Sequence, residues 1–191
     1  KVNIENILSL LEKRLRKGDV AGFIYEPLVQ GAAAMKMHDA KGLNKLLQLL
    51  QKHKVVTIAD EVMTGFGKTG RCFASDHLQT KPDIMCLSKA LTAGLVPMGL
   101  TTCTEDIYLA FYSDETAKGL FHGHTYTGNP LACNAALAAL ELLQTDDIQE
   151  RIMNIIRWHQ QFDEEVKDHP KVAQTRQLGV IYALDLDIKM E

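Results

Sequence analysis

The stretch Val55-Val-Thr-Ile-Ala-Asp-Glu61 decides the fold, because an apolar run ends there on two acidic residues. A similar apolar run, Val20 to Tyr25, precedes it and is closed by Glu26-Pro27. Between the two runs, Asp39 begins a segment with leucines at helical spacing. A strand, a helix and a second strand in this order form a βαβ unit with a right-handed crossover. The sequence therefore predicts an α/β fold with a mostly parallel sheet and flanking helices.

Further apolar patterns outside this unit predict four helices and three strands. In chain order these are a helix over 4–15 capped by Asn3, strands over 84–87 and 99–103, a helix over 104–111 capped by Thr104, helices from 129 and over 148–166, and a strand over 179–186. Residues 113–128 form a long polar loop. Asp146-Asp147 interrupts the helical pattern, and we place a domain boundary between residues 1–145 and 146–191.

Composition excludes several classes of partner. The 191 residues carry a net charge of −3, which gives no electrostatic case for nucleic acid or an anionic membrane. We find no apolar stretch of membrane-spanning length and no secretory signal before the first helix. The four cysteines stand far apart without a CxxC pair, so we expect small buried hydrophobes in a reducing, cytoplasmic compartment and no metal site.

Lys89 and Asp60 are the candidate catalytic pair. Lys89 follows the apolar run Ile84 to Leu87, which is typical of a buried strand. Burying an ammonium group is costly, and desolvation favours the neutral amine that Schiff-base chemistry needs. Asp60 ends the preceding strand, and ligands of open α/β sheets bind beyond the carboxyl ends of strands. A carboxylate that keeps a pyridine nitrogen protonated beside such a lysine indicates a pyridoxal 5'-phosphate (PLP) site.

The Gly-rich loop over 64–70 lies between these two strands. It lacks the spacing of a Walker loop, so we expect a tight turn that shapes the wall of the site instead of a phosphate cradle. Lys68 in this loop lies near the entrance of the site or is simply solvated.

A second polar segment, Phe121-His-Gly-His-Thr-Tyr-Thr-Gly-Asn-Pro130, precedes a predicted helix. Its two histidines have no third ligand at a metal-binding spacing. Thr125 stands close to the helix N-terminus, where backbone N–H groups and a hydroxyl can hold a phosphate. Thr127 or Asn129 is expected to cap the helix.

Four blocks of the sequence resemble the class III (subgroup II) PLP-dependent aminotransferases of fold type I. The blocks are Glu26-Pro27 with Gln30-Gly31, Asp60-Glu-Val-Met-Thr-Gly-Phe-Gly-Lys-Thr-Gly70, Leu87-Ser-Lys-Ala-Leu-Thr-Ala-Gly94 and His122-Gly-His-Thr-Tyr-Thr-Gly-Asn-Pro130. The residues in and around these blocks are most similar to those of the adenosylmethionine-8-amino-7-oxononanoate aminotransferases of biotin synthesis. For that branch, the resemblance implies S-adenosylmethionine as amino donor and 8-amino-7-oxononanoate as acceptor.

The resemblance also implies a role for each site residue. Lys89 would hold PLP as a Schiff base and then move the proton, while Asp60 would pair with the pyridinium nitrogen. His124 and Thr125 would approach the cofactor phosphate of the neighbouring subunit in a homodimer with shared active sites. Gly123 would lie against substrate, and Lys68 stands where relatives often carry a substrate-binding arginine.

The resemblance further implies that residues 1–145 are the later part of the PLP-binding large domain and that 146–191 begin the small C-terminal domain. The chain would then lack the family's Gly-Ser phosphate loop, the aromatic residue that stacks on the ring and the C-terminal arginine. A fragment of this kind is expected to be inactive alone. Two alternatives stay open, namely another class III ω-aminotransferase (ornithine, GABA or diamine type) and a non-catalytic domain that keeps the fold.

Overall fold

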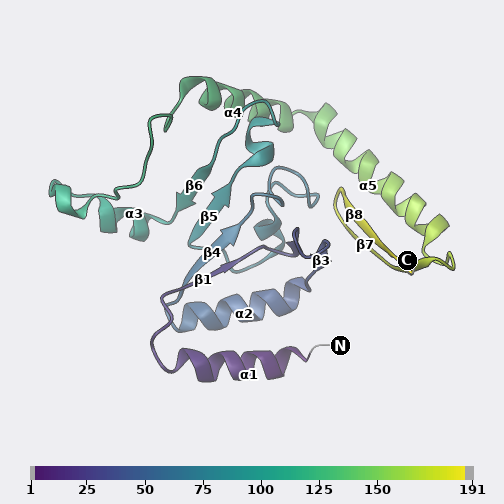
Figure 1. The fold of residues 1–191 in the computed structure, drawn as a ribbon, viewed down its shortest axis with the longest axis horizontal. Coiled ribbons are helices and arrows are strands. Elements are labelled where there is room, and N and C mark those ends of the chain that lie inside the picture. The colour runs from purple at the N-terminus through teal and green to yellow at the C-terminus, as the bar shows by residue number, and fades with distance from the viewer. Residues whose placement is uncertain (1–2, 188–191) are drawn as a thin grey trace, which may run out of the picture.

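The computed structural model describes residues 3–187 (Figure 1). The helices are α1 (Ile4–Leu15), α2 (Ala40–Lys52), α3 (Glu105–Phe111), α4 (Pro130–Leu143) and α5 (Asp146–Val166). The strands are β1 (Gly22–Tyr25), β2 (Val29–Gln30), β3 (Lys36–Met37), β4 (Val56–Asp60), β5 (Ile84–Leu87), β6 (Leu100–Cys103), β7 (Val172–Leu178) and β8 (Ile181–Leu186). Three short 3-10 helices are η1 (Ala74–His77), η2 (Lys89–Thr92) and η3 (Thr116–Lys118).

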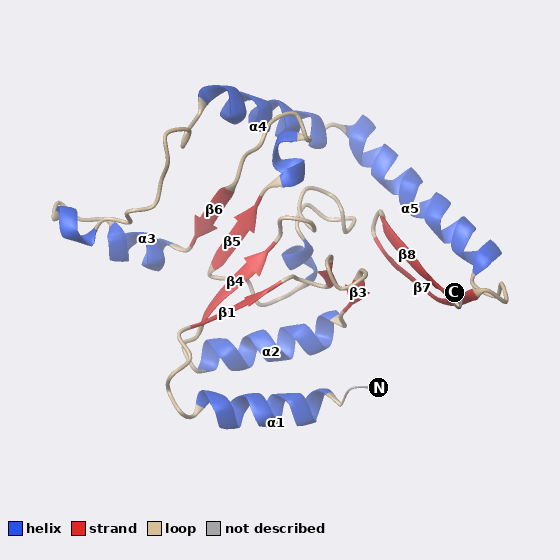
Figure 2. Ribbon diagram, in the orientation of Figure 1, coloured by secondary structure: helices blue, strands red, loops and turns tan. Residues whose placement is uncertain are grey.

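The central sheet has the strand order β1-β4-β5-β6. Strands β1, β4 and β5 are parallel, and β6 returns antiparallel to β5, as the arrows in Figure 2 show. The predicted α/β class with a mostly parallel sheet and flanking helices is confirmed. The register places Asp60 opposite Cys86, so the carboxyl ends of β4 and β5 meet at one edge of the sheet.

Two amphipathic helices cover one face of this sheet. Asn3 caps α1 by accepting a hydrogen bond from the Glu5 backbone N–H (3.0 Å), and Asp39 caps α2 through the N–H of Gly42 (2.6 Å). Helix α2 packs against β4, and α1 packs on α2 (Figure 1). Leucines and aliphatic strand residues between these layers form the core, including Leu15, Leu47, Leu50, Val55 and Ala59. The two predicted caps are confirmed.

The second half of the chain begins with an exposed connection. Thr104 precedes α3 as predicted, although its side chain makes no capping hydrogen bond. The segment between α3 and α4 runs outside the sheet and contains only η3 (Figure 1). Asn129 then caps α4 through the N–H of Leu131 (2.9 Å), which settles the choice of cap in its favour. Helix α5 starts at Asp146, where the helical pattern was expected to break.

Strands β7 and β8 form an antiparallel hairpin whose turn packs on the Gly-rich loop. The N–H of Val180 donates to the carbonyl oxygen of Lys68 (3.0 Å). Gly179, with φ +60°, lies so close that a Cβ there would be 2.2 Å from the carbonyl carbon of Thr69. Only glycine fits this approach. The hairpin therefore contributes to the shape of the loop that carries Lys68.

The structure differs from the sequence prediction in two respects. Strand β7 and the small β2–β3 pair were not predicted, because their sequences show little alternation between apolar and polar residues. Cys72 and Cys103 are exposed and not buried, because Cys72 lies in a loop and Cys103 on β6, whose residues are all exposed. Within residues 3–187 no helix is both long and apolar enough to cross a membrane.

Candidate active site

Asp60 is the last residue of β4 and is half-buried. Its Oδ1 accepts a hydrogen bond from the N–H of Val62 (3.1 Å), which turns the chain away from the sheet. Cys86 faces it across the β4–β5 ladder, and burial together with the Asp60 charge raises the pKa of the Cys86 thiol. The carboxylate of Asp60 therefore has a neutral neighbour on β5.

Lys89 begins η2 immediately beyond β5, with a left-handed φ of 47°. Two side chains fix this segment, since the hydroxyl of Ser88 donates to Met98 O (2.7 Å) and that of Thr92 to Val96 O (2.6 Å). The expectation of a buried lysine was wrong for this chain, because Lys89 is exposed. Its position in a 3-10 turn past the strand end leaves the side chain in solvent, so the desolvation argument does not apply here.

The parallel ladder nevertheless brings Asp60 and Lys89 to the same edge of the sheet. Asp60 pairs with Cys86 of β5, and Lys89 follows three residues after Cys86, just beyond the end of that strand. Carboxyl ends of adjacent parallel strands are where open α/β sheets bind ligands. A carboxylate and a primary amine thus follow adjacent parallel strands at the same end of the sheet.

An apolar cavity of about 350 Å³ lies next to this edge. Lys68 is at its boundary, and Ala90 and Ala93 of the segment after Lys89 line it. The other lining residues come from the Gly-rich loop, α4, α5 and the hairpin turn, namely Phe66, Gly67, Ala139, Leu142, Leu143, Ile148, Ile152, Ile155 and Val180. Lys68 itself is exposed, so it is a solvated lysine that also borders the apolar cavity.

The backbone N–H groups of three glycines in the Gly-rich loop donate hydrogen bonds to carbonyl oxygens in and beside the loop. The N–H of Gly65 donates to Glu61 O (2.9 Å), that of Gly67 to Cys72 O (3.2 Å) and that of Gly70 to Gly67 O (3.0 Å). These bonds agree with the predicted tight turn, because N–H groups engaged in this way are not free to hold a phosphate.

Gly123, His124 and Thr125 lie in the exposed segment before α4. The segment is folded on itself, since the N–H of His124 donates to Thr127 Oγ1 (2.9 Å) and that of Tyr126 to His124 Nδ1 (3.1 Å). Helix α4 packs against η2, and Ala139, Leu142 and Leu143 of its C-terminal part line the cavity together with Ala90 and Ala93. Among residues 3–187, no hydrogen bond links these three residues to Asp60 or Lys89.

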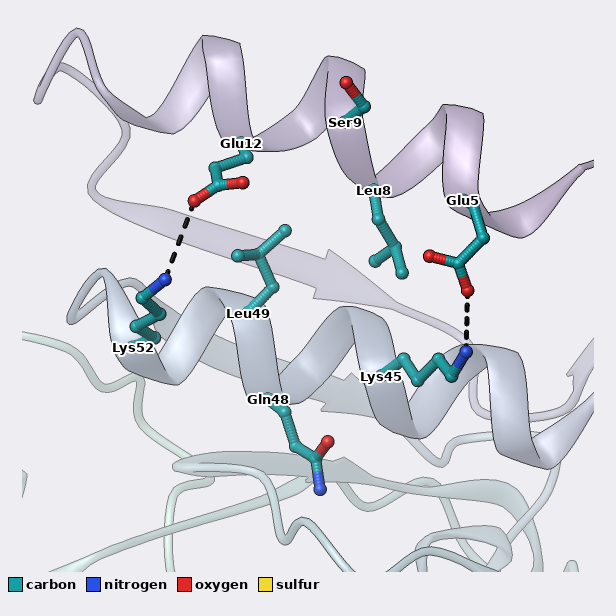
Figure 3. A pocket seen from close by; sticks show the side chains of 8 residues that line it. All are labelled: Glu5, Leu8, Ser9, Glu12, Lys45, Gln48, Leu49 and Lys52. Carbon is teal, nitrogen blue, oxygen red and sulfur yellow. Dashed lines mark hydrogen bonds and ion pairs between the residues drawn. The ribbon is translucent and has the colours of Figure 1, made fainter.

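A surface groove between α1 and α2, about 470 Å³ in volume, is unrelated to this site (Figure 3). Two ion pairs cross it, Glu5–Lys45 at 2.7 Å and Glu12–Lys52 at 3.6 Å. The charged groups in the groove are thus paired with each other, and they join two exposed helices.

Sequence reasoning did not assign a role to Glu61, the residue after Asp60. Its side chain is fully buried and accepts three hydrogen bonds from Thr64, Ala74 and Ser75. The signal was present in the acidic residue at the end of an apolar run, with a hydroxyl three positions later. In residues 3–187 no cluster of three or more metal-ligating side chains is found.

The residues at the sheet edge have the donor chemistry that the ring of PLP requires. A carboxylate such as Asp60 accepts a hydrogen bond from a protonated ring nitrogen, and a primary amine such as Lys89 can bond covalently to the aldehyde. The exposed Lys89 side chain has room to turn toward a ring held by Asp60. The two residues therefore fit the cofactor ring.

Relatives with assigned names share much of this sequence. The chain is 44% identical over 179 residues to an adenosylmethionine-8-amino-7-oxononanoate aminotransferase of Synechococcus elongatus, covering 94% of this chain and 42% of the relative. A Geobacter sulfurreducens protein of the same name is 42% identical over 170 residues, covering 88% of this chain and 38% of the relative. The chain thus spans about two-fifths of the length of these relatives.

Solved structures agree with this similarity. A Bacillus anthracis aminotransferase superposes with a TM-score of 0.88 at 29% identity, covering 97% of this chain and 42% of that one. Ornithine δ-aminotransferase of Plasmodium falciparum superposes with a TM-score of 0.81 at 32% identity, covering 94% of this chain and 46% of that one. The class III aminotransferase description matches residues 1–191, and this family depends on PLP. The chain, with a carboxylate and a lysine at one edge of its parallel sheet, belongs to the class III aminotransferase family.

Proposed function

We propose that this chain is part of a PLP-dependent aminotransferase that moves an amino group from S-adenosylmethionine to 8-amino-7-oxononanoate in biotin synthesis. The observation that carries the proposal is the placement of Asp60 and Lys89 at the carboxyl ends of β4 and β5. The named relatives, at 34–44% identity over most of the chain, support this substrate pair.

The two residues would act on the cofactor and substrate in different ways. Lys89 would hold the cofactor covalently through Nζ, and its free amine would carry the proton to and from the reacting carbon of the substrate. Asp60 would accept the hydrogen bond of the ring N–H and keep that nitrogen protonated. When bound, PLP supplies an electron sink for negative charge at the substrate carbon.

A homodimer with shared active sites is the second part of the proposal. His124 and Thr125 would bind the cofactor phosphate of the partner, and Gly123 would lie against its substrate. Supporting this, the surface around these residues is strongly apolar yet exposed, with Phe121 at 80% and Tyr126 at 74% of full exposure. Apolar patches of this kind mark interaction surfaces.

Lys68 is proposed as a substrate-binding residue, because its ammonium group borders the apolar cavity beside Lys89. We further propose that residues 1–145 belong to the large PLP-binding domain and that 146–191 begin the small domain. The end of α4 at Leu143 and the start of α5 at Asp146 support that boundary. A cytoplasmic location goes with this biosynthetic role.

The alternative is another class III ω-aminotransferase. It is favoured by the structural neighbours, which include ornithine aminotransferases and an (S)-enantioselective ω-transaminase of Thermomicrobium roseum at a TM-score of 0.85. A non-catalytic domain of this fold would keep Asp60 and Lys89 without a reaction.

A donor screen separates these candidates. The full-length protein, loaded with PLP, is mixed with S-adenosylmethionine or ornithine, and the visible absorbance of the bound cofactor is followed. We expect the absorbance to be lost with S-adenosylmethionine alone, and Lys89→Ala to show no change with either donor. Loss with ornithine alone would establish the alternative, and no loss with either donor, nor with GABA or a diamine tested in the same way, would indicate a non-catalytic domain.

A further inference from the structure

Glu61 is a fully buried carboxylate next to the candidate catalytic Asp60. Burying a charged group is costly in free energy unless partner groups compensate it. Its Oε2 accepts hydrogen bonds from Thr64 Oγ1 (2.6 Å) and the N–H of Ala74 (3.0 Å). Its Oε1 accepts a bond from the N–H of Ser75 (2.7 Å). Within the described range 3–187 no basic side chain forms an ion pair with it, so these three donors carry the compensation.

These donors join three pieces of chain around one side chain. Thr64 lies in the Gly-rich loop, while Ala74 and Ser75 begin η1, and all three are buried. Hydrogen bonds to a charged acceptor are shorter and stronger than neutral ones. The carboxylate of Glu61 therefore fixes the loop and η1 to the end of β4.

The backbone of Glu61 is fixed as well. Its N–H donates to Cys86 O (3.0 Å), which extends the β4–β5 ladder, and its carbonyl accepts from the N–H of Gly65 (2.9 Å). A Cβ at Gly65 would lie 2.9 Å from that carbonyl oxygen, so the turn is tightly closed. Backbone and side chain of Glu61 are thus held by five hydrogen bonds.

Side chains alternate between the two faces of β4, so the successive carboxylates Asp60 and Glu61 point to opposite faces. Thr57 and Ala59 are buried on one face, and Glu61 continues that face into the core. Asp60 points to the opposite, half-buried face. Asp60 is bonded directly to Glu61, and its carboxylate accepts the N–H of Val62 in the same turn, so a shift of the turn 61–65 would move this carboxylate.

We propose that Glu61 is a positioning residue that holds the Asp60 carboxylate in the direction needed to bind the ring nitrogen of PLP. The inference rests on the proposed function, since it assumes that Asp60 meets that nitrogen. Glu61 does not touch the cofactor. It acts through the turn 61–65 and through the ladder contact with Cys86.

The test compares Glu61→Gln with Asp83→Asn in the full-length protein. Asp83 is a matched control, because its carboxylate also accepts a backbone N–H and a hydroxyl, both from Thr57 (2.7 and 2.8 Å). It ties β4 to the start of β5, about 10 Å from Asp60 along the strand. Asp83→Asn keeps an acceptor oxygen and only weakens these bonds by removing its charge, whereas Glu61→Gln places an amide NH₂ against a backbone N–H beside Asp60.

Two readouts other than turnover are measured. One is the dissociation constant for PLP, and the other is the ¹⁵N resonance of the ring nitrogen in labelled PLP, which reports its protonation. In Glu61→Gln the amide NH₂ faces a backbone N–H, so the turn must shift. We expect binding to weaken about tenfold to a hundredfold, as for one lost charge-assisted bond, and the ¹⁵N signal to move toward the unprotonated position. Asp83→Asn should lower Tm through its weakened hydrogen bonds but leave both readouts within about twofold of wild type.

The other outcomes separate the two proposals. If Glu61→Gln keeps the wild-type ¹⁵N signal, or Asp83→Asn moves it equally, the positioning role is refuted. Asp60→Asn tests the proposed function itself, because an unmoved ¹⁵N signal in that variant would show that Asp60 does not meet the ring nitrogen. Should Glu61→Gln fail to fold, Thr64→Val removes only one of the three donors. It is then expected to move the signal in the same direction, and a wild-type signal would refute the inference.

Discussion

Replacing Gly179 with alanine should separate the β7–β8 hairpin from the Gly-rich loop. The added Cβ would lie 2.2 Å from Thr69 C, 2.4 Å from Gly70 N and 2.5 Å from Lys68 O. All three are backbone atoms, which cannot rotate away as a side chain does. The whole turn must therefore withdraw, and the Val180 N–H to Lys68 O hydrogen bond is lost.

The magnitude follows from two contributions. A non-glycine residue at φ +60° costs about 1–2 kcal/mol, and overpacking against rigid neighbours adds about 1–3 kcal/mol. Gly18→Ala is the matched control, because Gly18 has φ +72° but no atom within 4 Å of its Cβ position. The control should lose only about 1–2 kcal/mol from the backbone conformation.

Thermal denaturation and hydrogen exchange of the full-length protein measure both effects. Gly179→Ala should lower Tm more than Gly18→Ala and should speed exchange of the Val180 amide selectively. Equal losses of Tm in the two variants, with Val180 exchange unchanged, would refute the argument from close approach.

Three further predictions concern other parts of the chain. Lys89→Ala should abolish the borohydride-reducible bond to PLP, and mass spectrometry of the reduced protein would detect any lysine that replaces it. Asn129→Ala should destabilise by about 1 kcal/mol, because the cap on the N–H of Leu131 is removed; an unchanged unfolding midpoint would contradict it. The hydrogen bond from Arg176 lowers the pKa of Asp185. The pair should therefore contribute stability at pH values above about 4, and this contribution should be lost progressively as the pH falls below that value. In Arg176→Gln this part of the pH dependence of Tm should disappear.

Local signals in the sequence predicted most of the fold. Asn3, Asp39 and Asn129 were identifiable as caps because each bonds to N–H groups within three residues. The βαβ order was enough to place Asp60 and Lys89 at one sheet edge, since parallel pairing fixes which strand ends meet.

Contacts between distant segments could not be predicted in this way. Arg176 donates to the carbonyl oxygens of Ala34 (2.9 Å) and Met35 (3.3 Å), both in left-handed conformations, and so ties the β2–β3 turn to β7. No local sequence pattern predicts a contact between residues that are more than a hundred positions apart in the chain. The exposure of Lys89 was missed for a related reason, because strand burial does not determine where the chain goes after its last paired residue.

The hydrogen bond from Val180 to Lys68 also has a consequence for the order of folding. Asp60 and Lys89 can meet once β1, β4, β5 and β6 have formed, which needs the chain only as far as Cys103. The Gly-rich loop makes its hydrogen bond only when Val180 has been synthesised, 77 residues after Cys103, which takes a ribosome about 4 to 15 s at ordinary rates of synthesis. The candidate catalytic residues Asp60 and Lys89 are thus in place in a nascent chain before the Gly-rich loop is fixed, and variants of Gly179 should impair the second stage while leaving the first intact.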